Sequence, residues 1–200
     1  MTTLHEQLRQ ETRPLHEQTE QLLYTDALRA GTLSVEQYRH LLLMHAQFHG
    51  SLERAIDGHT AFFQDYEPDT RRKTPWLLND LAQTGLSADA VSTSLFANWS
   101  PARLLGAAYV GEGSMLGGKT VWNLLRQSPF LDTLLANARF YRGYGADTGQ
   151  RWRSFGTFLT TADAEPADVV EGARQAFLVY QTLFPQTRAQ AYLTEANPSA

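Results

Sequence analysis

Hydrophobic residues recur every three or four positions along most of this chain, a spacing that predicts α-helices. No segment shows the strict alternation of apolar and polar residues that marks a half-buried strand. The pattern therefore predicts an all-α fold. The expected helices begin near residues 3, 34, 74, 100, 129, 151 and 166, and a short aromatic segment at 62–66 is also expected to be helical. Segments 26–32 and 141–145 are predicted to be turns or loops, and 88–98 shows no clear pattern.

Local signals mark several helix ends. Thr3 with Glu6, and Ser34 with Gln37, have the capping-box spacing, so a helix is expected to start at each of these two places. Pro14 falls inside the first helix, where it removes a backbone donor and clashes with the preceding turn. We therefore expect that helix to bend or break just before Pro14.

The segment 100–125 is predicted to be one long helix, with Ser100 as its N-cap and Pro101 in the first position. It contains a cluster of glycines, namely Gly106, Gly111, Gly113, Gly117 and Gly118. An interior glycine costs about 1 kcal/mol relative to alanine, so the cluster costs roughly 4–5 kcal/mol of helix propensity. Gly113 and Gly117 are one turn apart and clear one face of the helix. Either a flat ligand or a crossing helix can approach the bare backbone there.

Composition narrows the class of protein. The chain has 200 residues, 42% hydrophobic and 19% charged, which suits one domain with a sizeable core. A net charge of −4 gives no reason to expect nucleic-acid binding, and we find neither a membrane-spanning apolar run nor a signal peptide. The chain has no cysteine, which excludes disulfides and thiolate metal sites and agrees with a cytoplasmic location. The segment GSMLGGKT lacks the spacing of a P-loop.

His16 is the first candidate for chemistry. It is predicted to lie with Leu8, Thr12 and Thr19 on the inner stripe of the first helix. Glu20, one turn later, is placed to orient one imidazole nitrogen, which would leave the other nitrogen for a metal. A core histidine with both nitrogens hydrogen-bonded is the alternative.

A second histidine pattern lies on the next helix. His45, His49 and Glu53 follow one another at one-turn spacing, as metal ligands can, but such ladders are also common on solvated helix faces. The sequence shows no obvious fourth ligand. The remaining histidines, His5, His40 and His59, are expected on the surface.

Cationic and aromatic residues provide further candidates. Arg9 and Arg13 precede His16 by two turns and one turn, where they are placed either to bind a dianionic ligand or to form a solvated face. Arg153 lies next to Trp152 in a similar basic and aromatic setting. The last long helix carries an aromatic stripe whose default role is core packing. Its members are Phe177, Tyr180 and Phe184.

Taken together, these segments resemble the haem oxygenase family. LRQETRPLHEQTE is similar to the family's proximal-helix motif, and LGAAYVGEGSMLGGKTV is similar to the distal helix of bacterial, biliverdin-producing members. YRGYG, RWRSF and AFLVYQTLF support the match, which covers about residues 4–185. The resemblance implies a single haem oxygenase-like domain over 1–200, built of several helices, with a tail at 197–200.

The resemblance also implies a site. His16 would bind the haem iron with Glu20 behind it, and Gly113 and Gly117 would be the two distal glycines. Ser114 stands where some members have an aspartate that orders water, and Gly111 replaces a bulkier aliphatic residue. Arg9, Arg13 and Arg153 are the candidates for the propionates. The other expected haem contacts are Tyr109, Gly118, Phe177, Tyr180 and Phe184.

Family members use haem as both substrate and cofactor. They release biliverdin, carbon monoxide and iron, and they take electrons from an external reductase or ferredoxin. We therefore expect an oxygen-dependent haem-degrading enzyme in the cytoplasm, with no membrane or nucleic-acid partner.

Three alternatives remain at this stage. The first is a non-catalytic haem carrier or sensor on the same fold. The second is a haem-free di-iron protein of that fold, for which only His45, His49 and Glu53 provide a hint; the thiamin-degrading relatives need a cysteine that this chain lacks. The third is a purely structural helical protein, in which the glycine cluster serves helix crossing alone.

Overall fold

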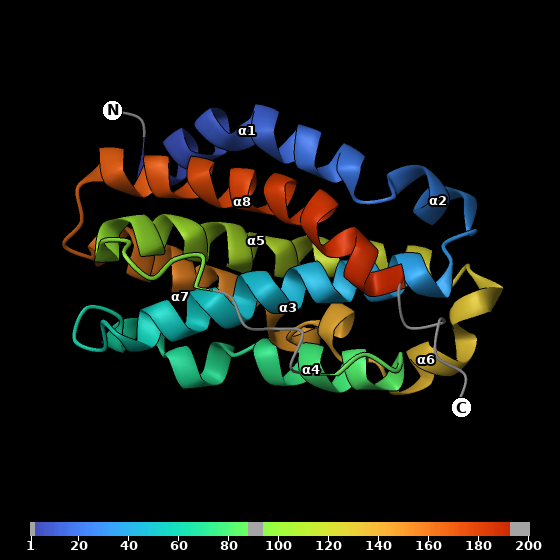
Figure 1. Ribbon diagram of the computed structural model, residues 1–200. Coiled ribbons are helices and arrows are strands. Elements are labelled where there is room, and N and C mark those ends of the chain that lie inside the picture. Colours follow the sequence, from blue (N-terminus) through green and yellow to red (C-terminus); the bar gives the residue numbers. More distant parts are fainter. Residues whose placement is uncertain (1–2, 88–93, 193–200) are drawn as a thin grey trace.

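The centre of the molecule is helix α5 (Pro101–Leu125), which packs along α8 (Pro166–Tyr192). Helix α1 (Leu4–Leu22) lies on the other side of α8, and α3 (Val35–Asp57) packs against α8, α5 and α4 (Thr74–Gln83). In the view of Figure 1, α1, α8, α5, α3 and α4 follow one another from top to bottom. Helix α7 (Thr148–Thr161) packs against both α5 and α1.

This computed structural model describes residues 3–87 and 94–192, and no strand occurs in those two ranges. The shorter helices are α2 (Thr25–Ala30) and α6 (Asp132–Asn137), and 3₁₀ turns form at Gln64–Tyr66, Pro68–Arg71, Pro129–Leu131, Phe140–Arg142 and Gly145–Asp147. The predicted all-α class is therefore confirmed. None of the helices in the described ranges is long and apolar enough to cross a membrane.

The predicted helix starts are confirmed at their caps. The side chain of Thr3 accepts a hydrogen bond from the Glu6 backbone while the Glu6 side chain accepts one in return, and Ser34 and Gln37 repeat this arrangement at α3. Ser100 caps α5. These ends were predictable because a capping box satisfies backbone donors within a few residues of itself.

Three local predictions are wrong in whole or in part. Helix α1 continues through Pro14, so of the predicted bend or break the break does not occur. Helix α1 packs along α8, and this tertiary packing outweighs the loss of one backbone hydrogen bond. Segment 26–32 is not a turn, since its first residues belong to α2 and only Gly31 adopts the left-handed conformation that ends that helix. Of the aromatic segment 62–66, only the 3₁₀ turn is helical. Residues 88–93 and 197–200 lie outside the described ranges.

The crossing of α5 and α8 depends on two glycines. A Cβ on Gly106 would overlap the carbonyl oxygen of Val169, and a Cβ on Gly172 would overlap the backbone of Arg103. The two backbones therefore meet in direct contact at this point. Crossing geometry, one of the two interpretations of the glycine cluster, is correct for Gly106.

Candidate active site

Gly113 and Gly117 lie on an open face of α5. A Cβ built on either glycine would meet no atom within 4 Å, apart from its chain neighbours and the adjacent helix backbone, in the described part of the chain. Helix crossing therefore does not account for these two glycines. The open face leaves the helix backbone accessible to a flat molecule.

Helix α1 runs beside this open face. Both α1 and α5 pack on α8 without extensive contact with each other, and both run in the same direction (Figure 1). Tyr109 of α5 lies near Arg9 and Thr12 of α1, and both residues are close enough to lower the pKa of the Tyr109 phenol. One turn further along each helix lie Gly113 and His16. The two residues predicted to face haem are therefore level with each other along the two helices.

The side chain of His16 is half-exposed, with 54% of its surface accessible. The prediction that it lies on the inner stripe is wrong, because Leu8, Thr12 and Thr19 are buried while His16 lies at the edge of that stripe. Its ring contacts Phe177 of α8 edge-on, with the centroids 5.7 Å apart. The imidazole is therefore supported on one side and accessible on another, as a ligand to a bound metal must be.

Glu20 is the only carboxylate that forms an ion-pair contact with His16 in the described structure. The distance from its Oε1 to Nε2 of His16 is 3.7 Å, and both side chains are more than half exposed. This distance exceeds that of a direct hydrogen bond. A bridging water or a change of rotamer is needed for Glu20 to orient the ring.

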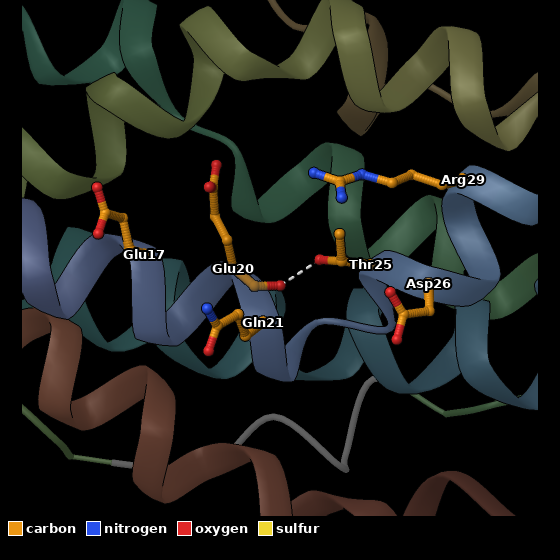
Figure 2. Close-up of a pocket in the computed structure, with 6 residues that line it drawn as sticks. All are labelled: Glu17, Glu20, Gln21, Thr25, Asp26 and Arg29. Atoms are coloured by element: carbon orange, nitrogen blue, oxygen red, sulfur yellow. Dashed lines mark hydrogen bonds between the residues drawn. The ribbon is translucent and has the colours of Figure 1, made fainter.

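A polar pocket of about 310 Å³ lies at the end of α1 and the start of α2, and Glu20 is among its lining residues. Figure 2 shows Glu17 and Glu20 projecting from α1 to one side of the chain, and the side chain of Arg29 extending along α2 toward them. The hydroxyl of Thr25 donates to the carbonyl oxygen of Glu20 and joins the two helices. The complete lining is Glu17, Glu20, Gln21, Thr25, Asp26 and Arg29.

The predicted propionate ligands differ in their surroundings. Arg9 is exposed beside Tyr109, and burial raises the pKa of the Tyr109 phenol although Arg9 acts in the opposite direction. Arg153 is exposed on α7. Arg13 is already engaged, since its Nε donates to Glu17 at 2.8 Å. Arg9 and Arg153 are thus the freer of the three to take a carboxylate.

The aromatic stripe of α8 divides between three environments. Phe177 contacts His16, whereas Tyr180 stacks on Phe48 with the ring centroids 4.1 Å apart. Phe184 packs against Tyr24 and the ring of His40. Of the three predicted haem contacts, only Phe177 lies beside His16. Tyr180 and Phe184 belong to the protein core, which was the default expectation for this stripe.

Three positions in the distal motif either face other parts of the protein or form a hydrogen bond within the helix. A Cβ on Gly118 would lie 3.3 Å from the carbonyl oxygen of Tyr141, so this glycine faces the loop after α6 and its predicted haem contact is wrong. Ser114 donates its hydroxyl hydrogen to the carbonyl oxygen of Gly111 at 2.7 Å. At Gly111 the absent side chain leaves room for the ring of His49, whose Cε1 would lie 3.3 Å from a Cβ there.

The histidine ladder of α3 is buried rather than solvated. Nδ1 of His45 is hydrogen-bonded to the Tyr180 hydroxyl at 3.0 Å, and burial lowers the pKa of His45 to about 4. Glu53 points elsewhere and accepts backbone N–H groups of Lys73 and Thr74. No group of three or more metal-ligating residues was found in the described ranges.

His40 is also buried, so its predicted surface position is wrong. It lies between Tyr24, which contacts its Nδ1 at 2.7 Å, and α8, where its Nε2 is 2.9 Å from the carbonyl oxygen of Phe184. Burial lowers the pKa of His40 to about 4. A neutral imidazole in this position connects α3 and α8 to the junction between α1 and α2.

A buried charged cluster behind the open face was not predicted from the sequence. Glu112, directly before Gly113, is buried and accepts hydrogen bonds from Tyr66, Arg71, Lys73 and Tyr144. Burial raises the pKa of Glu112, but Lys73 and Arg71 outweigh it and hold that pKa below its ordinary value. The available signal was a single carboxylate within an otherwise apolar and glycine-rich run.

Comparison with known proteins identifies the family. The family model described as "Heme oxygenase" matches residues 2–186. The chain belongs to the haem oxygenase family. It is 28% identical over 163 residues to a haem oxygenase of Xanthomonas campestris pv. campestris (strain 8004), which covers 78% of this chain and 93% of that protein.

Solved structures share the fold. The NO- and CO-bound haem oxygenase from Neisseria meningitidis matches with a TM-score of 0.78 at 20% identity, covering 94% of each chain. The haem oxygenase from Leptospira interrogans matches with a TM-score of 0.75 at 17% identity, covering 93% of this chain and 100% of that one. The predicted haem oxygenase-like fold is confirmed.

Family membership also confirms the predicted class of activity, a haem oxygenase that degrades haem, and makes haem its ligand. The residues present fit such a ligand. The open face at Gly113 and Gly117 suits a flat ring, and His16 provides an accessible imidazole on the neighbouring helix. The haem-free di-iron and purely structural alternatives are therefore set aside.

Proposed function

We propose that haem lies between His16 of α1 and the Gly113–Gly117 stretch of α5, and that the protein converts it to biliverdin, carbon monoxide and iron. The observation that carries this proposal is the combination of an unobstructed glycine face with a half-exposed imidazole level with it on the next helix. Haem supplies the iron that binds oxygen and is itself the molecule that is oxidised.

His16 holds the iron as a neutral imidazole. Phe177 supports the edge of its ring, and Glu20 orients the nitrogen that does not face the iron, through a water or after rotation. This arrangement restricts rotation of His16 and keeps one nitrogen directed at the ligand.

The distal side is formed by backbone rather than by side chains. Gly113 and Gly117 would allow α5 to approach the haem ring closely, and the backbone dipoles there would stabilise negative charge without placing a strong proton donor at the site. The only carboxylate of α5, Glu112, is held in the buried cluster behind the helix. Ser114 gives its hydrogen to Gly111, so its oxygen is available as an acceptor for an ordered water.

Arg9 and Arg153 bind the propionates, since both are exposed and Arg9 lies beside Tyr109 at the start of the open face. Arg13 takes part only if it leaves Glu17. We further propose that one domain extends over residues 1–200, that the protein acts in the cytoplasm, and that electrons come from an external reductase or ferredoxin.

Haem turnover by the purified protein tests this function. With haemin, a reductant and oxygen, the Soret band should disappear and biliverdin should form, with carbon monoxide released. A stable oxy-haem spectrum would instead show a haem carrier or sensor.

The ligand assignment is tested by His16→Ala, with His59→Ala as the matched control because His59 lies after α3, away from the site. His16→Ala should lose or strongly alter the haem spectrum, and the control should keep it. A haem spectrum unaffected by His16→Ala would exclude His16 as the iron ligand.

A further inference from the structure

Helix α5 is held from behind at the position where its front is open. Gly113 and Gly117 provide no side chains on the open face, and a Cβ there would find no neighbour within 4 Å in the described ranges. The position of this backbone relative to a ligand on the open face therefore depends on the contacts that the other faces of α5 make. Glu112 makes the most polar of these contacts, and it directly precedes Gly113.

Four donors from two separate segments hold the Glu112 carboxylate. The Tyr66 hydroxyl donates to Oε1 at 2.9 Å, Arg71 Nη1 donates to Oε2 at 3.0 Å, and Lys73 Nζ donates to Oε1. The Tyr144 hydroxyl lies 3.1 Å from both oxygens. Hydrogen bonds are directional, so this set fixes the position of the carboxylate more narrowly than apolar contacts would.

The donors are themselves anchored to other helices. Arg71 donates through Nη2 to the Ser154 hydroxyl at 2.7 Å and to the carbonyl oxygen of Arg151 at 3.2 Å, both in α7. The backbone N–H of Lys73 donates to Glu53 of α3 at 2.6 Å. The cluster thereby connects α5 at Glu112 to α7 and α3 through hydrogen bonds.

Stability alone is a poor explanation for this cluster. It buries two cations and one carboxylate, and removing such charges from water costs about as much as their mutual attraction returns. Well-packed apolar side chains generally stabilise a core at least as well. A buried charged cluster is better explained by a role in holding the surrounding helices in one specific arrangement.

We propose that Glu112 is a positioning residue of the haem site. Glu112 does not touch haem. It fixes the distance between the Gly113–Gly117 backbone and the haem ring, and this distance determines which carbon at the ring edge is oxidised. The proposal rests on the proposed function. It assigns a role in the haem site to Glu112, which lies on the face of α5 directed away from the ligand.

The test compares Glu112→Gln with Asp80→Asn in the haem-loaded protein. Asp80 is also a buried carboxylate, but its hydrogen bonds go to Asn79 and to the backbone of Arg139 and Phe140, not to α5. Glu112→Gln should weaken haemin binding by about tenfold and change the ratio of bilin isomers, because small displacements at a site have large effects. Asp80→Asn should leave haemin affinity and isomer ratio as in the wild type.

Equal effects of both substitutions, or no effect of Glu112→Gln on affinity and isomer ratio, would overturn the proposal. If Glu112→Gln does not fold, Tyr144→Phe replaces it, since this variant removes one hydrogen bond without leaving a charge unpaired. Tyr144→Phe should change the isomer ratio relative to the wild type, and an unchanged ratio would overturn the proposal. Failure of the proposed function would appear separately, as absence of haem turnover in the wild type.

Discussion

Two glycine regions of α5 show opposite uses of the same residue. Gly106 is in backbone contact with α8 across from Gly172, whereas Gly113 has open space in the direction of its missing side chain. The two positions are about two helical turns apart and lie on nearly the same face. The same face of α5 is therefore in contact with α8 at Gly106 and open at Gly113.

The difference lies in what offsets the cost of glycine in a helix. At Gly106 the close approach of two backbones gains packing that a larger residue would prevent. At Gly113 no contact within residues 3–87 and 94–192 offsets this cost, which fits a face that is kept open for a ligand. An interior glycine without a neighbour is thus a better indicator of a binding face than glycine content alone.

The largest expected effect is at the crossing. Gly172→Ala should lower the free energy of unfolding by about 3 kcal/mol or more, because the new methyl group overlaps the backbone of Arg103 and neither helix can move alone. Urea denaturation of the haem-free protein measures this change. A loss below about 1 kcal/mol would show that the helices separate easily, and the contrast between the two regions would disappear.

Next in size is the effect of filling the open face. Gly113→Leu should weaken haemin binding by about a hundredfold while the haem-free protein remains folded, because the leucine occupies the space of the ring. Haemin titration followed by absorption measures the affinity. Lys119→Leu, on an exposed position of the same helix, is the control and should bind haemin normally. Normal binding by Gly113→Leu would show that haem does not use this face.

A smaller effect of opposite sign is expected from alanine at the same position. Gly113→Ala should raise the free energy of unfolding of the haem-free protein by about 0.5–1 kcal/mol, since alanine favours the helix and meets no neighbour there. Thermal and urea denaturation give the value. Destabilisation would mean that Gly113 is in contact with protein after all.

The smallest effect concerns pH. The pKa of Glu112 is lower in the folded protein than its ordinary value of 4.5, so its contribution to stability is present above that value and is lost as the pH falls through the folded pKa. Acid should therefore loosen α5 near Gly113 before it loosens the crossing at Gly106. Amide hydrogen exchange along α5 below pH 4.5 measures the order, and simultaneous loosening would contradict it.

Much of the fold could be predicted from helical periodicity and caps. The capping boxes at Thr3 and Ser34 and the start of α5 at Ser100 were correct because each signal acts within a few residues. The short helix α2 was missed, since six residues carry too little periodicity to identify a helix. The path of α1 through Pro14 depended on its packing along α8.

The candidate site was predicted in part. His16 contacts Phe177 and Gly113 has open space beside it, whereas Gly118, Tyr180 and Phe184 face protein; the haem contacts of the first three residues stay a prediction. The motif places Gly117 and Gly118 side by side, but adjacent residues of a helix point about 100° apart. Which of them faces a ligand depends on where the neighbouring helices lie.

The sequence by itself determined the long helices, several of their caps, the family and the presence of a bare stretch on α5, because periodicity, capping and motif are properties of neighbouring residues. Tertiary structure alone decided which glycines touch protein, that His16 is half-exposed, and that Glu112 is buried among Tyr66, Arg71, Lys73 and Tyr144. The reason is physical: the surroundings of a helix face are supplied by segments far away in the chain, and a buried charge is tolerated only where those segments bring it partners.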